Sequence, residues 1–177
     1  SSIKHPFIQS LGSGFIARTC CMLQPPCQSS FVVGITGASR SGKSSLSKSL
    51  ALALDTDRCQ IVAQDDFRRT GKRVAEDSWV QKDTTWLRNW ETPNQTDWPA
   101  FEEAVTRAAS SSNIVLVEGY CLLHSDAVRA LLQSLIWIEI GEDTLRHRRS
   151  SYPKGWDRAA YFDECIWPAY LQYRATV

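Results

Sequence analysis

The sequence lacks the features that define several large classes of protein. No stretch approaches the roughly 18 consecutive apolar residues of a membrane-spanning helix. The charges nearly cancel, with 20 Lys and Arg against 19 Asp and Glu, so no basic excess indicates nucleic-acid binding. The six cysteines form no C-x-x-C pair, and no histidine lies at zinc-ligand spacing from a cysteine pair. We therefore expect reduced thiols, a cytoplasmic protein, and neither a membrane nor a nucleic acid as partner.

The beginning of the chain lacks acidic residues altogether. The first one in the sequence is Asp55, and within residues 1–30 only Lys4 and Arg18 carry charge. An acid-poor, serine-containing segment is compatible with organellar targeting, but two basic residues are few for a transit peptide. We expect residues 1–30 to be a disordered extension and residues 31–177 to form a single domain.

A phosphate-binding loop follows the first predicted strand. Residues 31–36 (FVVGIT) are a short, β-branched apolar run, which is typical of a buried parallel strand. Residues 37–44 (GASRSGKS) match the motif G-x-x-x-x-G-K-S. Leu46, Leu50 and Leu54 then recur at helical spacing. The order of strand, loop and helix predicts a site where backbone N–H groups and a helix N-terminus bind phosphates.

The fixed positions of this loop have distinct physical roles. Gly37 and Gly42 let the backbone wrap tightly around phosphate oxygens. Lys43 can reach the terminal phosphates, and the hydroxyl of Ser44 can bind Mg²⁺. The predicted ATP-binding residues are Gly37, Ala38, Ser39, Arg40, Ser41, Gly42, Lys43, Ser44, Ser45 and, from a basic cluster farther along the chain, Arg146.

Two further predicted strands end in acidic residues. Residues 59–63 (CQIVA) lead to Asp65 and Asp66, and residues 113–117 (NIVLV) lead to Glu118. Ligands of α/β sheets bind at the carboxyl ends of parallel strands, where Glu118 could hold Mg²⁺ directly or through water. One aspartate could accept a proton from an attacking hydroxyl. Neighbouring strand residues point apart, so we choose Asp65 as this base; the alternative is that both aspartates cap a turn.

The remaining pattern indicates an α/β fold. A fourth strand is predicted over residues 135–140, and helices over residues 101–109 and 125–133, the latter with Ser125 as N-cap. Alternating strands and helices predict a three-layer P-loop fold, with a parallel sheet flanked by helices. Residues 146–149 (RHRR) suit a basic lid that closes over phosphates, although a solvated basic surface is the alternative reading.

Several motifs carry a family resemblance. Residues 64–67 (QDDF), 89–93 (NWETP) and 117–120 (VEGY) resemble the uridine kinase-like group of small P-loop kinases. Residues 161–174 (YFDECIWPAYLQYR) resemble the Y-F-D-x-x-x-W-P-x-Y-L-x-Y-R stretch of nicotinamide riboside kinases. The resemblance implies an ATP- and Mg²⁺-dependent kinase that phosphorylates the 5′-hydroxyl of a small-molecule nucleoside, nicotinamide riboside, in NAD salvage. A uridine or cytidine kinase and a non-catalytic nucleotide-binding protein remain the alternatives.

The resemblance also implies roles for individual residues. Asp65 falls on the catalytic acid, and Trp90 and Glu91 fall on the pair that contacts the base and the ribose hydroxyls. The π face of Trp90 suits a cationic nicotinamide ring. Implied metal ligands are Ser44, Asp65 and Glu118, and Lys43 is catalytic with Asp65. The substrate-binding set is Asp65, Asp66, Phe67, Arg68, Trp90, Glu91, Arg148, Tyr152 and Pro153.

Two segments depart from the family pattern. Residues 69–85 are long and polar, and we expect a mobile loop there. The sequence ends at Val177, whereas the resemblance implies a further strand, an adenine-contacting loop and a final helix. We therefore expect adenine recognition to lack these elements.

Overall fold

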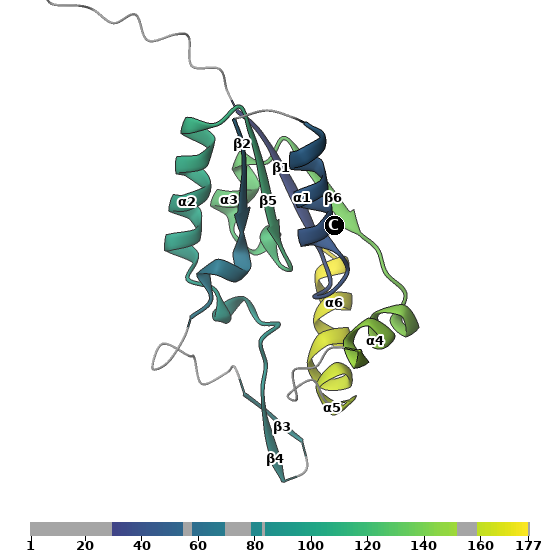
Figure 1. The fold of residues 1–177 in the computed structure, drawn as a ribbon. Coiled ribbons are helices and arrows are strands. Elements are labelled where there is room, and N and C mark those ends of the chain that lie inside the picture. Colours follow the sequence, from purple (N-terminus) through teal and green to yellow (C-terminus); the bar gives the residue numbers. More distant parts are fainter. Residues whose placement is uncertain (1–29, 55–57, 70–78, 83, 152–158, 177) are drawn as a thin grey trace, which may run out of the picture.

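A four-stranded parallel sheet in the order β2-β5-β1-β6 lies at the centre of the molecule (Figure 1). The computed structural model describes residues 30–54, 58–69, 79–82, 84–151 and 159–176, so residues 1–29 of the extension predicted over residues 1–30 lie outside the described part. The structure confirms the four predicted strands. They form where short apolar runs with β-branched residues are bounded by polar residues. They are β1 (Phe31–Gly37), β2 (Cys59–Ala63), β5 (Ile114–Gly119) and β6 (Ser134–Ile138).

The register of this sheet brings distant parts of the chain together. β1 pairs with β5 so that Ile35 lies opposite Glu118 and Thr36 opposite Gly119. The loop after β1 and the acidic end of β5 therefore emerge side by side at the carboxyl edge. β2 pairs with the other side of β5, and this brings the turn after Ala63 to the same edge.

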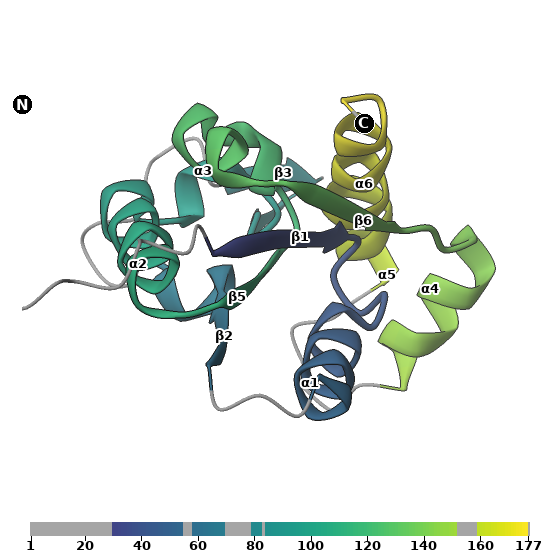
Figure 2. The same ribbon diagram turned by 90° about the horizontal axis from the view of Figure 1, so that it is seen from above.

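Helices cover both faces of the sheet, which confirms the predicted three-layer α/β architecture. α1 (Lys43–Ala53) lies on one face, and α2 (Trp98–Ser111) and α3 (Asp126–Leu131) lie on the other (Figure 2). Short 3₁₀ helices cover Gln64–Phe67, Pro93–Gln95 and Leu122–His124. The main core forms where α2 packs on the strands, and its buried residues include Phe101, Val105, Ala108, Val32, Val62, Val115 and Val117.

α1 buries a narrower face than its leucine spacing predicts. Its buried residues are Lys43 and Ser47, whereas Leu46 and Leu50 are half-buried and Leu54 is 42% exposed. The small side chain of Ser47 lets the helix lie close to the sheet, and its hydroxyl donates to the carbonyl of Ser44 at 3.2 Å. The helix is confirmed, but its apolar face is only partly buried.

The predicted cap of α3 is confirmed. Ser125 Oγ accepts a hydrogen bond from the N–H of Val128 at 3.1 Å, as an N-cap does. The same hydroxyl donates to Glu102 on α2 at 2.6 Å. The cap therefore also joins two helices on the same face of the sheet.

A β-hairpin occupies part of the segment that was predicted to be a loop. β3 (Trp79–Lys82) and β4 (Thr85–Arg88) pair antiparallel and extend away from the central sheet (Figure 1). The loop prediction is therefore wrong for residues 79–82 and for Thr85, and residues 70–78 and 83 lie outside the described part. The polar sequence of this hairpin shows no clear alternation of apolar residues, so the pattern could not reveal it.

The aromatic C-terminal segment packs beside the basic helix. α4 (Glu142–Ser150) carries the basic cluster, and α5 (Ala159–Tyr161), a π-helical turn (Phe162–Ile166) and α6 (Trp167–Arg174) follow. None of the helices in the described ranges combines the length and hydrophobicity needed to cross a membrane. The cluster that joins the C-terminal segment to α4 and the phosphate loop contains Ala38, Leu145, Tyr161, Phe162, Cys165, Ile166 and Tyr170.

Candidate active site

A cavity of about 640 Å³ lies at the carboxyl edge of the sheet. It is lined by the phosphate loop, the 3₁₀ turn after β2, the end of β5, residue Glu91 and the basic helix α4. These elements come from five separate parts of the sequence. The cavity therefore lies where parallel α/β sheets bind their ligands.

The phosphate loop has the backbone conformation that its glycines were predicted to permit. Gly37 has a φ of 143° and Gly42 a φ of 110°, in the region that side chains disfavour. Lys43 opens α1, is 8% exposed and donates from Nζ to the carbonyl of Ala38 at 2.8 Å. Burial lowers the pKa of Lys43, and the carboxylates of Glu118, Glu91 and Asp65 oppose that shift. The ammonium group is thus held among anionic groups at the cavity wall.

Ser44 and Glu118 form a direct pair at the base of the cavity. Ser44 Oγ donates to Glu118 Oε1 at 2.7 Å, and Glu118 is 8% exposed. Two such oxygens suit Mg²⁺, which takes one or two protein ligands and completes its shell with phosphate oxygens and water. In the described part of the chain no group of three or more His, Cys, Asp or Glu gathers as a metal cage. The residues therefore fit a phosphate-bound Mg²⁺.

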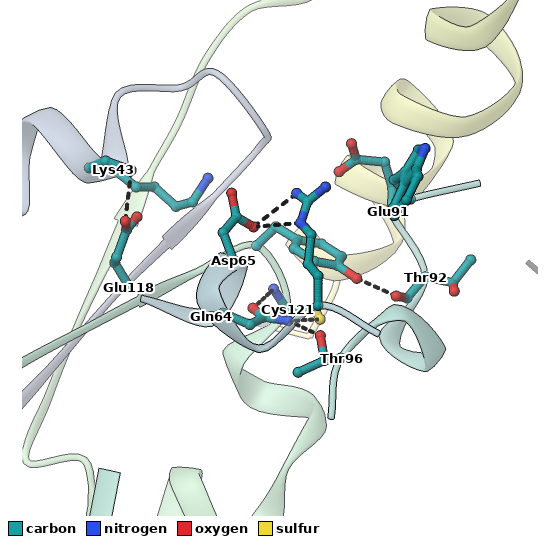
Figure 3. Close-up of polar contacts among 12 residues, drawn as sticks. Lys43, Gln64, Asp65, Glu91, Thr92, Thr96, Glu118 and Cys121 are labelled. Carbon is teal, nitrogen blue, oxygen red and sulfur yellow. Dashed lines mark hydrogen bonds and ion pairs between the residues drawn. The ribbon is translucent and has the colours of Figure 1, made fainter. Parts of the chain in front are cut away.

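Asp65 lines the cavity together with Lys43 and Glu118. Figure 3 shows its carboxylate between Lys43 and Glu91. Asp65 Oδ1 accepts hydrogen bonds from Arg68 Nη2 at 2.9 Å and Nε at 3.3 Å, while the aspartate side chain stays 65% exposed. Arg68 therefore fixes the orientation of the carboxylate, which remains accessible to a substrate hydroxyl.

The buried side chain of Gln64, which is 1% exposed, anchors the turn that carries Asp65. Gln64 Nε2 donates to Thr96 Oγ1 at 2.8 Å and to Cys121 Sγ at 3.1 Å (Figure 3). Its Oε1 accepts the N–H of Cys121 at 3.3 Å. The amide thus joins the turn after β2 to the turn after β5. Sequence reasoning gave Gln64 no role of its own.

The neighbours of Asp65 lie outside the cavity. Asp66 is exposed and is not among the lining residues. Phe67 turns into the core, where its ring centroid lies 5.4 Å from that of Phe101. The structure therefore does not bring these two predicted substrate-binding residues to the cavity.

Glu91 meets a buried arginine from α4. Glu91 Oε1 lies 4.0 Å from Arg149 Nη1, and both side chains are 6% exposed. Burial raises the pKa of Glu91; Arg149, a hydrogen bond from Ser39 and the charges of Arg68 and Lys43 work against it. A carboxylate and a guanidinium side by side can bind a pair of ribose hydroxyls.

Sequence reasoning chose Arg148 and not its neighbour Arg149 as a substrate-binding residue. Both line the cavity, but Arg148 Nη1 donates to the carbonyl of Ser41 at 2.9 Å and so holds the phosphate loop. A signal was present in the sequence, because Leu145 is the only apolar residue of α4 and Arg149 lies one turn beyond it on the same face.

Arg146 faces away from the cavity. Its guanidinium donates to Glu142 at 2.7 Å and to Asp163 at 2.8 Å, and it lies over the ring of Phe162. The predicted ATP-binding residue instead joins α4 to the π-helical turn. The charge pattern of α4 could not show whether Arg146 faces the cavity or pairs with an acidic residue elsewhere, because its partner Asp163 is distant in sequence.

Trp90 has cations as its neighbours. The guanidinium carbon of Arg88 lies 3.5 Å from the ring centroid, and that of Arg68 lies 5.7 Å away. The backbone N–H of Trp90 donates to the hydroxyl of Tyr161 at 2.9 Å. Trp90 is not among the residues that line the cavity, and the predicted residues Tyr152 and Pro153 lie outside the described part of the chain.

Comparisons with known proteins agree with this geometry. A solved structure of a candidate fructose transport system kinase from Silicibacter sp. TM1040 matches with a TM-score of 0.60 and 19% identity, over 86% of this chain and 88% of that chain. The fold and the phosphate loop together define an α/β P-loop protein. No protein-family model matches the sequence.

Sequence relatives identify the family. Nicotinamide riboside kinase 2 of Mus musculus is 30% identical over 156 residues, which cover 81% of this chain and 79% of that protein. Nicotinamide riboside kinase 1 of Homo sapiens is 28% identical, over 81% of this chain and 76% of that protein. The chain belongs to the nicotinamide riboside kinase family.

Proposed function

We propose that this protein transfers the γ-phosphoryl group of ATP to the 5′-hydroxyl of a ribonucleoside, with nicotinamide riboside as the substrate. The observation that carries the proposal is the meeting of Lys43, the Ser44–Glu118 pair, Asp65 and Glu91 in one cavity of about 640 Å³. The names of the relatives support the choice of substrate. We also propose a cytoplasmic location, in keeping with the free thiols of Cys59, Cys121 and Cys165.

The phosphate end of the cavity provides positioning and positive charge. Backbone N–H groups of the loop, the N-terminus of α1 and Lys43 would hold the β- and γ-phosphates. Ser44 and Glu118 would hold Mg²⁺, which when bound neutralises charge on the phosphate oxygens. Phosphoryl transfer depends mainly on such positioning, because the transferring group needs little covalent help from the protein.

The acceptor end provides a base and a ribose site. Asp65 accepts the proton of the 5′-hydroxyl while the bond from O5′ to the γ-phosphorus forms. The bond from that phosphorus to the bridging β,γ-oxygen breaks, and ADP leaves. Glu91 accepts hydrogen bonds from the ribose hydroxyls, and Arg149 donates to them; burial of both groups strengthens these contacts.

Replacement of the proposed base tests the function. Asp65→Asn keeps the size of the side chain but removes the proton acceptor, so we expect kcat to fall about 100-fold or more. Formation of nicotinamide mononucleotide from nicotinamide riboside and ATP–Mg²⁺ gives kcat, and calorimetry checks that ATP still binds.

Asp66→Asn is the matched control, because it makes the same change one residue along and outside the cavity. We expect this variant to keep the wild-type rate. Equal rates for Asp65→Asn and the wild type would contradict the role of Asp65. A folded wild type that makes no product from nicotinamide riboside would contradict the proposed substrate.

A further inference from the structure

The backbone that carries Glu91 belongs to no helix or strand. Residues 89–92, the Glu91 segment, join β4 to the 3₁₀ turn at Pro93–Gln95. The N–H of Glu91 donates to Asn89 Oδ1 at 2.9 Å, which closes a local turn. A segment outside regular structure takes its position from the side chains that bind its polar groups. Here those side chains include three tyrosines from distant parts of the chain.

Tyr161 of α5 contacts both the Glu91 segment and the arginine that Glu91 meets. Its hydroxyl accepts the N–H of Trp90, the residue before Glu91, at 2.9 Å. The guanidinium carbon of Arg149 lies 5.9 Å from the centroid of its ring, within reach of a cation–π contact. Tyr161 is 2% exposed, so both contacts are shielded from water. One side chain therefore links the Glu91 segment to α4.

Two more tyrosines bind carbonyl groups of the Glu91 segment. Tyr173 of α6 donates to the carbonyl of Glu91 at 3.5 Å. Tyr120, in the turn after β5, donates to the carbonyl of Thr92. Burial raises the pKa of Tyr120, Tyr161 and Tyr173, so these hydroxyls stay protonated at neutral pH. The segment is thus held from three separate elements.

The aromatic C-terminal segment supplies two of these three tyrosines. None of residues 161–174 lines the catalytic cavity, whereas Glu91 and Arg149 both line it. Tyr161 and Tyr173 can therefore affect a bound substrate only through the residues that they hold. Loss of their hydroxyls would leave the phosphate loop and the Ser44–Glu118 pair untouched, so the expected effect is confined to the ribose end of the cavity.

We propose that Tyr161 positions the Glu91–Arg149 pair for ribose binding, with Tyr120 and Tyr173 holding the same segment. Tyr161 is a positioning residue, because it lies outside the cavity and acts through the pair. The inference rests on the proposed ribonucleoside kinase activity and deepens it by naming what holds the ribose site in place.

Removal of one hydroxyl tests the inference. Tyr161→Phe keeps the ring beside Arg149 but leaves the N–H of Trp90 without its acceptor. We expect the KM for nicotinamide riboside to rise about fivefold. The KM for ATP and kcat should change by less than about twofold, since ribose contacts act alike in the ground and transition states. Calorimetry gives the dissociation constant of the riboside without turnover.

Tyr170→Phe is the matched control. Tyr170 lies in the same C-terminal segment and is 3% exposed, and its hydroxyl accepts the N–H of Ile140 at 3.2 Å instead of a group near Glu91. Its loss should lower stability as much as that of Tyr161 and leave the KM for the riboside at the wild-type value. If Tyr161→Phe does not fold, Tyr173→Phe replaces it, with an expected rise in this KM of about twofold.

A double-mutant cycle distinguishes positioning from a general loss of structure. In a Glu91→Ala background the carboxylate is absent, so Tyr161→Phe has little left to displace. We therefore expect the second substitution to change the dissociation constant of the riboside by less than about twofold there. An independent structural effect would instead weaken binding by the same factor in both backgrounds.

The outcomes separate the inference from the proposed function. An unchanged riboside KM in Tyr161→Phe, or in Tyr173→Phe where that variant replaces it, overturns the inference. An equal rise in Tyr170→Phe does so too, as does a full effect in the Glu91→Ala background. In each case product formation by the wild type would still uphold the proposed function. Riboside binding that weakens as expected in Tyr161→Phe, with no product from the wild type, would uphold the positioning role and contradict the kinase activity.

Discussion

Glu91 is the site residue whose charge folding disfavours. The side chain is 6% exposed, and burial raises its pKa despite Arg149, Ser39, Arg68 and Lys43 nearby. A carboxyl group with a raised folded-state pKa binds its proton in the folded protein before it does in the unfolded chain. Its contribution to stability is therefore greatest at low pH and is lost as the pH rises through the folded-state pKa.

This sign gives a prediction for Glu91→Gln. We expect the free energy of unfolding of the wild type, measured against this variant, to rise as the pH falls from 8 to 5. Urea unfolding at several pH values gives both curves, and Glu103→Gln on the exposed face of α2 is the control with a flat difference. A difference for Glu91→Gln that falls toward pH 5 would contradict the raised pKa.

At the scale of elements, Gln64 and Gly119 determine how the turn with Asp65 meets β5. A Cβ on Gly119 would lie 2.1 Å from Oε1 of Gln64, so no other residue fits there without displacing the amide. Displacement would break the hydrogen bonds of Gln64 to Thr96 and Cys121. The turn would then lose the anchor that aims Asp65 into the cavity.

We therefore expect Gly119→Ala to lower stability by about 1–3 kcal/mol and to lower kcat. Gly141→Ala is the control, because a Cβ at Gly141 meets no atom within 4 Å and its φ is −72°. It should change stability by less than about 1 kcal/mol and leave kcat unchanged. Urea unfolding and steady-state kinetics measure both; a Gly119→Ala protein with wild-type kcat would show that Gln64 does not position the base.

Local patterns predicted the elements whose residues are neighbours in sequence. The strand before the phosphate loop, the cap at Ser125 and the acid at Glu118 each depend on a few adjacent residues, and all are present. The buried side of α4 and the hairpin were harder to predict, because the residues around them come from distant segments of the chain. Arg149 was passed over because its partner Glu91 lies 58 residues earlier in the sequence. The pairing of Arg146 with Asp163 could not be predicted either, because Asp163 lies on another element.

At the scale of the whole molecule, the sheet order creates the proposed metal-binding pair. Ser44 comes after β1 and the loop that follows it, and Glu118 is the penultimate residue of β5. These residues meet because the two strands are neighbours in parallel register. Neither strand would place its oxygen usefully if another strand lay between them. The order β2-β5-β1 then adds Asp65 on the far side of β5, so that the proposed base and the proposed metal ligands share one edge.

This arrangement predicts how ligands stabilise the fold. We expect ATP and Mg²⁺ to bind only the folded chain, so at 100 times the dissociation constant they should add about 2.7 kcal/mol, or roughly 5–10 °C in Tm. Glu118→Gln should lose the part of this shift that requires Mg²⁺, while the shift with ATP and EDTA stays as in the wild type. Differential scanning fluorimetry gives Tm for the wild type and for Glu118→Gln, each with ATP–Mg²⁺ and with ATP and EDTA. Glu103→Gln is a surface control that keeps the full shift. An undiminished Mg²⁺-dependent shift in Glu118→Gln would mean that Glu118 does not hold the metal, and the pairing of β1 with β5 would then serve the sheet alone.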